Sequence, residues 1–145
     1  AQLVDFLEDG KAFATFRAMV EAQGGDVSMV DDPSLLPRAS IVETVRAVNQ
    51  HYVAGVHAEA IARASFELGG GRATKKDSLD HAVGVVVHVK VGDAVASGTP
   101  LATIHANDRA KLQTALSLVH GAITYSRDPV TPLPHVYETI VGKAQ

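Results

Sequence analysis

Valines alternate with more polar residues over 83–91, and this alternation is the clearest pattern in the chain. A period of two places successive side chains on opposite faces of a β-strand. The pattern therefore predicts a strand over residues 83–91 with one apolar face and one more exposed face. The apolar face would carry Val85, Val87, Val89 and Val91, and the exposed face Val86, His88 and Lys90.

Four further segments are predicted to be strands because they are short and rich in β-branched and aromatic residues. They cover residues 41–48, 52–56, 101–105 and 123–126. The strand at 101–105 is entered through Pro100, a position that suits the first residue of a strand. The apolar tail at 136–141 is predicted to form a last strand or a short helix.

Apolar residues recur at helical spacing in three other segments, which are predicted to be helices over 10–23, 58–68 and 108–120. Glycines stand at the predicted ends of all three, at Gly24, Gly69 and Gly121, where they commonly terminate helices. The first helix places two Phe residues on one stripe in a chain with few aromatics, so we expect it to dock against another surface.

Residues 26–37 contain two prolines and at most one helical turn, so they are predicted to be a linker and the boundary between two parts of the chain. Residues 1–37 would form a terminal helix and linker, and residues 38–145 a second domain. Strands and helices mix without strict alternation. The fold class expected is α+β, with a mixed, largely antiparallel sheet and flanking helices.

Composition narrows the functional classes. The chain has 145 residues, a net charge of −3 and no cysteine. Disulfides, thiolate metal sites and a cysteine nucleophile are excluded, and no clustered basic surface favours nucleic acid. No apolar run is long enough to span a membrane, so no membrane partner is expected and a cytoplasmic setting is predicted. Because the chain opens without Met, on an apolar pattern already under way, we expect a fragment of a longer protein at least as readily as Met removal.

The densest candidate for a site is the run Gly69-Gly70-Gly71-Arg72, whose backbone amides could approach a phosphate while Arg72 clamps it. It follows a predicted helix, however, and a helix C-terminus carries the dipole end that disfavours an anion. A helix stop and tight turn, with Arg72 pairing locally, is the favoured interpretation.

The remaining candidate chemistry is weak. The seven histidines show no metal-ligand spacing, and no GxSxG elbow supports a Ser-His-Asp site. Asp77 and Asp80 could be a pair of acids, although capping and turn roles are commoner for aspartate. No catalytic, cofactor-binding or metal-binding residue is assigned, and no cofactor is expected.

The segment 91–104, with Gly92-Asp93, Val95, Gly98 and Leu101, looks like the hairpin of biotinyl and lipoyl carrier domains. Those domains carry a modifiable lysine at a hairpin tip. Here Lys111 follows inside a predicted helix, so a carrier or interaction module is kept as the alternative.

Seven blocks in order closely resemble the C-terminal part of the pyrimidine-nucleoside phosphorylases, relatives of thymidine phosphorylase. They include GKA-x-x-x-F-x-x-M-x-x-AQGGD (10–26), DDPSLLP (31–37), LGGGRATKKDSLD (68–80), KVGDAV (90–95) and LATIHAN (101–107). The resemblance covers almost the whole chain. It departs at His51 and His57, where the family usually has Gly and Asp, and at Gly70, where Ala is common.

The resemblance implies that the parent is a homodimeric transferase, about three times longer, that serves nucleoside salvage. That enzyme cleaves a pyrimidine nucleoside with phosphate, giving the free base and a pentose 1-phosphate. Its phosphate-binding and base-binding residues lie in the earlier two thirds, and no matching motif occurs here. Residues 38–145 would then be an α/β-hammerhead-like C-terminal domain, structural and inactive alone, whose partner is the rest of the parent enzyme.

Overall fold

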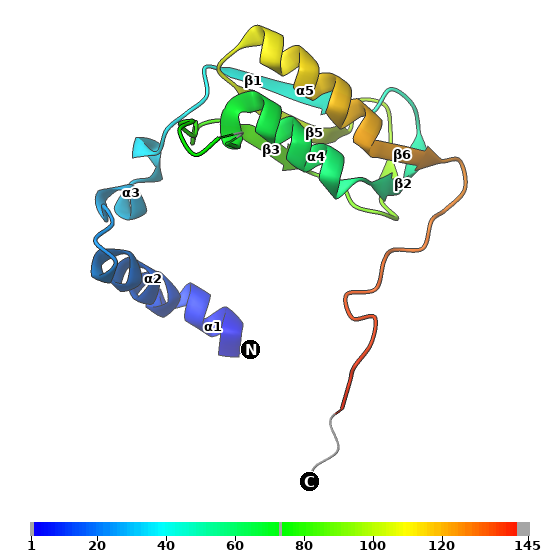
Figure 1. Ribbon diagram of the computed structural model, residues 1–145. Coiled ribbons are helices and arrows are strands. Elements are labelled where there is room, and N and C mark those ends of the chain that lie inside the picture. The colour runs from blue at the N-terminus through cyan, green and yellow to red at the C-terminus, as the bar shows by residue number, and fades with distance from the viewer. Residues whose placement is uncertain (1, 73, 142–145) are drawn as a thin grey trace. The chain divides into compact units, whose positions relative to one another are not determined.

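The computed structural model describes residues 2–72 and 74–141 and divides the chain into two compact units, Ala1–Pro37 and Arg38–Gln145. Figure 1 shows the helices of the first unit in blue and the strands and helices of the second from cyan to orange. The helices and antiparallel strands of the second unit confirm the predicted α+β class. No helix of the described ranges is long and apolar enough to cross a membrane.

The first unit consists of short helices separated by tight breaks. They are α1 (Gln2–Glu8), α2 (Lys11–Ala22), α3 (Ser28–Asp31) and the 3-10 turn η1 (Pro33–Leu35). Gly10 separates α1 from α2 with φ of 77°, a left-handed conformation that glycine adopts without strain. The predicted helix over 10–23 is confirmed as α2, whereas the sequence reading did not assign α1.

An ion pair ties α2 to α3 inside this unit. The Arg17 Nε and Nη2 atoms donate to the two carboxylate oxygens of Asp31 at 2.9 and 3.1 Å. This two-pronged geometry is the stronger form of the arginine–carboxylate pair. The hydrogen bond from Arg17 lowers the pKa of Asp31.

The second unit contains two three-stranded antiparallel sheets in place of the single sheet that was predicted. One has the order β1-β5-β3 and the other β4-β2-β6. The strands are β1 (Ile41–Arg46), β2 (His51–Val56), β3 (Gly84–Val87), β4 (Ala94–Val95), β5 (Pro100–Ala106) and β6 (Ile123–Ser126). Central β5 therefore joins segments about sixty and about twenty residues before it in the chain.

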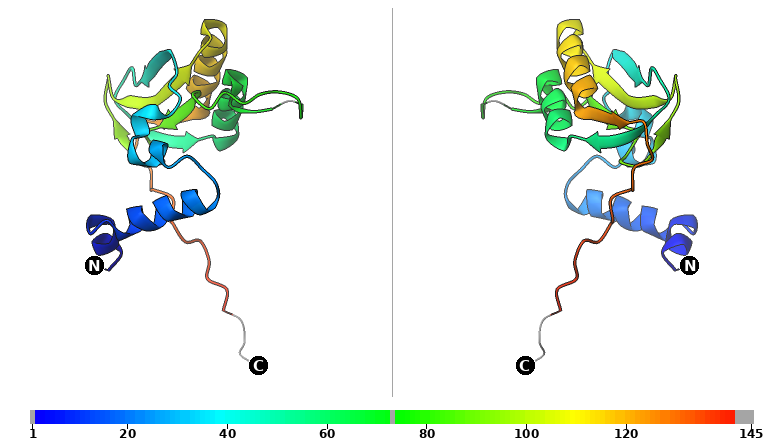
Figure 2. Two further views of the ribbon diagram at one scale, coloured as in Figure 1. Left: turned by 90° about the vertical axis from the view of Figure 1, so that its left-hand side faces the viewer. Right: turned by 90° about the vertical axis from the view of Figure 1, so that its right-hand side faces the viewer.

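Two helices, α4 (Ala58–Ser65) and α5 (Arg109–Ala122), pack against each other and against the β1-β5-β3 sheet (Figure 2). Buried side chains from both helices and both sheets form one core, with Leu101, Ile104, Val53 and Val119 its largest fully buried members. The helix predicted over 108–120 is confirmed as α5, and its residues Leu112, Ala115 and Val119 are buried in this core. Asp108 begins this helix by accepting a hydrogen bond from the Lys111 amide at 2.9 Å.

Several predicted elements or boundaries were wrong, among them the end of β1, which lies at Arg46 and not at residue 48. The predicted strand over 83–91 is shorter, since β3 covers Gly84–Val87 and one further backbone hydrogen bond, from the His88 amide to the Leu101 carbonyl at 2.9 Å, joins the segment to β5. The alternation continues beyond β3: Val85, Val87, Val89 and Val91 are half-buried, and Val86, His88 and Lys90 are exposed. The Gly92-Asp93 turn ends the segment, and the Lys90 amide donates a hydrogen bond to the Asp93 carboxylate within this turn at 2.9 Å. Gly121 lies inside α5 and does not end it. Residues 136–141 form neither strand nor helix.

Candidate functional site

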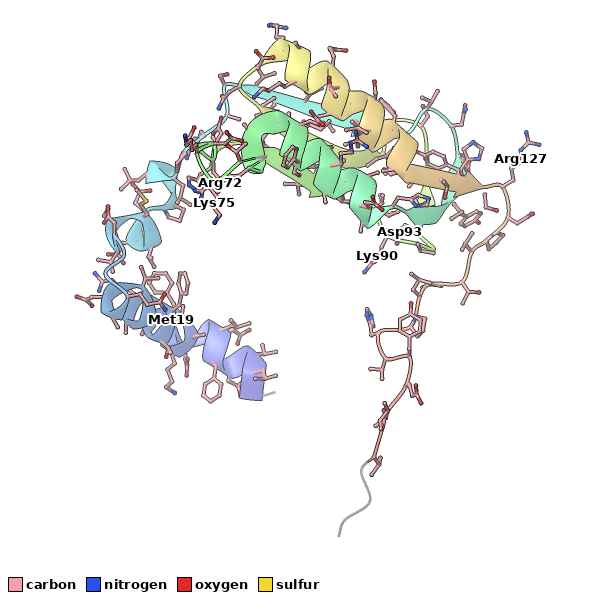
Figure 3. All side chains as sticks on the ribbon, in the orientation of Figure 1. Met19, Arg72, Lys75, Lys90, Asp93 and Arg127 are labelled. Carbon is pink, nitrogen blue, oxygen red and sulfur yellow. The ribbon has the colours of Figure 1, made fainter. Side chains whose placement is uncertain are left out.

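The glycine run is the end of a helix. After Ser65 the helix widens into one π-helical turn, η2 (Phe66–Gly70), and Gly69 has φ of 113°. A side chain at that φ would be strained, and the Gly69 carbonyl accepts a hydrogen bond from the Asp80 amide at 3.0 Å. The predicted helix stop and tight turn are thus present. The predicted local partner of Arg72 is not found within the described residues, and Figure 3 shows Arg72 and Lys75 on the loop that follows the helix.

The two acids suggested by the sequence have separate structural partners. The Asp77 carboxylate accepts hydrogen bonds from the Thr74 amide at 2.8 Å and the Thr74 hydroxyl at 2.7 Å, which closes a small turn. Asp80 instead accepts from the Ala82 amide at 3.0 Å and from Asn107. Because each carboxylate already serves as a hydrogen-bond acceptor in its own turn, the geometry favours structural roles over acid–base catalysis.

Asn107 joins three segments that are far apart in the sequence. Its Nδ2 donates to Asp80 Oδ2 at 2.8 Å, and its Oδ1 accepts from the Ser40 amide at 2.7 Å. Only one orientation of the amide group satisfies both partners, because a carboxylate accepts and a backbone N–H donates. Asn107 therefore connects the loop ending at Asp80 with the start of the Arg38–Gln145 unit. The sequence reading missed this contact, and its only signal was an Asn placed just after a strand.

The Asn107 contact predicts an acid-sensitive contribution to stability. The hydrogen bond from Asn107 is the largest cause that lowers the pKa of Asp80. A carboxylate with a lowered folded-state pKa stabilises the fold above its unfolded pKa, about 3.9, and this contribution is lost as the pH falls further through the folded value. We therefore expect Asn107→Ala to be less stable than the unsubstituted chain at pH 6. We also expect this variant to lose less of its stability between pH 6 and pH 3.

Urea unfolding at the two pH values measures this difference. Asn49→Ala is the matched control, because Asn49 is exposed and makes no hydrogen bond to another described residue. An equal acid-induced loss in the parent chain and Asn107→Ala would contradict the assignment.

The histidines do not assemble a metal site. Within the described residues there is no group of three His, Asp or Glu side chains that could hold an ion. His51 instead packs its ring against Tyr125, with 5.8 Å between ring centroids, and burial raises the pKa of that tyrosine. His88 Nε2 forms a 2.8 Å hydrogen bond with the Thr103 hydroxyl. In the described structure, His51 is therefore a packing residue and His88 is a surface residue.

The hairpin that resembles a carrier domain lacks its lysine. The turn at Gly92-Asp93 and the second turn at Gly98 are both present, with φ of 96° at Gly92 and 87° at Gly98. Lys111, the nearest lysine beyond β5, lies in the first turn of α5 and not at a hairpin tip. Its amide is held by Asp108, so the position is part of a helix start. The geometry gives no support to a carrier module.

Comparison with known proteins identifies the same family that the ordered sequence blocks resemble. Residues 52–126 match the family model described as the pyrimidine nucleoside phosphorylase C-terminal domain. The chain is 41% identical over 134 residues to a pyrimidine-nucleoside phosphorylase of Geobacillus stearothermophilus, and this alignment covers 92% of the chain. It is 39% identical over 132 residues to the pyrimidine-nucleoside phosphorylase of Bacillus subtilis, with 91% of the chain covered.

The chain spans only 31% and 30% of the length of these two relatives. The matched family model extends from β2 to β6 and so includes most elements of the larger unit, with both helices that cover its core. The predicted resemblance is confirmed on this ground: the chain belongs to the pyrimidine nucleoside phosphorylase C-terminal domain family.

Proposed function

We propose that this chain is the C-terminal part of a pyrimidine-nucleoside phosphorylase, the enzyme that converts a pyrimidine nucleoside and phosphate into the free base and a pentose 1-phosphate. The observation that carries the proposal is an alignment over 92% of the chain with 31% of a relative of that name. Within the parent enzyme, phosphate would attack the sugar C1 while hydrogen bonds to the base stabilise its developing negative charge, so catalysis would rest on positioning and electrostatics.

The role proposed for the chain itself is structural. Its acidic residues Asp77 and Asp80 hold turns, and its described histidines form no ligand group. The phosphate-binding and base-binding groups would come from the rest of the parent. The chain would support the phosphate-side domain and contribute to the closure that brings the two substrates together.

The first unit is proposed to be the last helical segment of the parent's larger domain, and residues 38–145 its α/β-hammerhead-like C-terminal domain. Support comes from α2, which buries none of its residues within the first unit. Phe13 is 52% exposed, and Phe16 and Met19 are each 49% exposed. Apolar side chains clustered at this exposure are typical of a surface that another part of a protein covers.

The resemblance further supports a homodimeric parent enzyme that works in the cytoplasm and serves nucleoside salvage. The absence of cysteine is compatible with a reducing compartment. The partner proposed for the chain is the rest of that enzyme, and neither nucleic acid nor a membrane is proposed as a partner.

The test compares two proteins: the complete parent enzyme and the 145-residue chain alone. Each is assayed for release of free base from uridine or thymidine in the presence of phosphate. We expect turnover from the complete enzyme and no release above background from the chain alone, since the groups that bind both substrates would be missing. Release by the isolated chain at a rate near that of the complete enzyme would contradict the proposal.

A further inference from the structure

The face of the β1-β5-β3 sheet opposite α4 and α5 carries both polar and apolar side chains at matched positions. Thr44 on β1 and Val86 on β3 both lie directly opposite Thr103 on central β5. Because side chains two residues apart share a face, Arg46 and His88 extend the same surface toward the end of the sheet where β5 begins. Three segments of the sheet thus contribute to one patch.

This patch is hollowed. Thr44, Arg46, His88, Pro100 and Thr103 line a cavity of about 350 Å³. None of these lining residues is acidic. The register of the sheet shifts between Val45 and Arg46, so that Arg46 comes to lie opposite Pro100 at the rim of the hollow. A register irregularity of this kind changes the direction of a nearby side chain, and the residue beside this one is Arg46.

The Arg46 side chain is held in place by the backbone. Its Nη1 donates to the Gly98 carbonyl at 2.9 Å. The turn that carries this carbonyl is itself fixed, because the Gly98 amide donates to the Ala47 carbonyl at 2.8 Å and the Ala47 amide to the Thr99 carbonyl at 2.9 Å. A guanidinium has five N–H groups, so this anchor leaves most of its donors available.

Arg46 has no acidic counterpart within the described residues. Its one described hydrogen bond goes to a neutral carbonyl, and the ion pairs of the described chain use other cations. An arginine that is held by the backbone, without a carboxylate, keeps its charge and its planar fork for an external oxyanion.

The other lining groups add donors around that charge. The hydrogen bond with Thr103 at 2.8 Å holds the His88 ring against the sheet face. The Thr44 hydroxyl has no hydrogen-bond partner within the described residues, and a hydroxyl can donate to an anion. The guanidinium of Arg46 and the free hydroxyl of Thr44 are therefore two donor groups that line one hollow, with the His88 ring beside them.

We propose that this hollow, formed by Thr44, Arg46, His88, Pro100 and Thr103, is a binding pocket for an oxyanion group, either a phosphate or a carboxylate. Arg46 supplies the charge and two N–H donors, and Thr44 supplies a hydroxyl donor. A phosphate would come from a free ion or metabolite, whereas a carboxylate would come from a protein side chain. The pocket lies on elements that carry no assigned function, and it does not depend on the proposed phosphorylase activity.

Nuclear magnetic resonance of the 145-residue chain tests the pocket, with the ring signals of His88 as the reporter. Inorganic phosphate and N-acetylaspartate amide are titrated separately at constant ionic strength, with chloride as the reference. We expect the chemical shifts of the His88 ring to change and saturate with at least one of the two oxyanions. The compound that binds more tightly then identifies whether the natural ligand is a phosphate or a protein carboxylate. Shifts that do not saturate with either compound would overturn the proposal.

Variants separate the pocket from general charge effects. Arg46→Gln is expected to weaken binding by about tenfold or more, since it removes a charge-assisted pair of hydrogen bonds. Arg127→Gln is the matched control, because this arginine lies after β6, outside the hollow (Figure 3), and should bind as the parent chain does. Equal weakening in both variants would overturn the proposal.

Thr44→Val provides a second variant in case Arg46→Gln disturbs the bulge. It keeps the shape of the side chain and removes the free hydroxyl, so it should weaken binding while leaving the amide spectrum of the sheet unchanged. If both Thr44→Val and a folded Arg46→Gln bound the oxyanion with unaltered affinity, the proposal would also be overturned.

Discussion

Replacing Ile104 with alanine is expected to lower the free energy of unfolding of the larger unit by about 2–5 kcal/mol. Ile104 is fully buried at the middle of β5, where it pairs with Glu43 of β1 on one side and with Val85 of β3 on the other. Truncation would remove apolar surface from the core and leave a cavity that neighbours on three strands cannot all move to fill. Urea unfolding followed by circular dichroism measures the change.

Val86→Ala is the matched control for that substitution. Val86 lies on the adjacent strand β3, but its side chain is 49% exposed on the opposite face of the sheet. Its truncation is expected to cost less than about 1 kcal/mol, because half of the side chain already contacts water. A similar loss in both variants would show that the buried face of the sheet is not the one described.

Gly92→Ala is expected to destabilise the larger unit by about 1–3 kcal/mol through backbone strain and a steric conflict. Gly92 has φ of 96°, a conformation that alanine adopts only with strain. An added Cβ would also lie 2.8 Å from Pro132 Cγ and 3.1 Å from Pro132 Cα. Since the second of these is a backbone atom, the segment at Pro132 would have to move away from the turn.

Gly98→Ala separates the two causes. Gly98 has φ of 87°, but a Cβ at that position meets nothing within 4 Å. Gly98→Ala should therefore lose stability through backbone strain alone. The difference in free energy of unfolding between the two variants then measures the steric conflict between the added Cβ at position 92 and Pro132. If Gly92→Ala were no less stable than Gly98→Ala, the contact with Pro132 would be refuted.

Sequence patterns predicted the elements whose signals are local. The helix at 108–120 was predicted because its apolar residues recur at helical spacing, and it is present as α5. The short strand β6 matches its predicted residues, and the glycine run was read as a helix end because Gly69 follows the apolar stripe. Each of these depends on neighbours within a few residues, which is the range over which capping and periodicity act.

Other features depended on partners distant in the chain. The alternation over 83–91 continued past β3, whose register with β5 ends at the pair Val87 and Ala102 although β5 itself begins at Pro100. Asn107 could not be singled out, because its partners Ser40 and Asp80 are 67 and 27 residues away. The tail at 136–141 is apolar enough to suggest a strand, but it pairs with no strand of the described chain.

The sequence by itself determined the membership of this chain in a phosphorylase C-terminal domain family, its α+β class and the absence of a metal-ligand or nucleophile motif. Ordered blocks and local periodicity suffice for these conclusions. The tertiary structure alone decided that there are two sheets, that β5 is central, and that Arg46, His88 and Thr44 meet at one hollow. The physical reason is that strand pairing and side-chain convergence depend on contacts between distant segments, which no local pattern encodes.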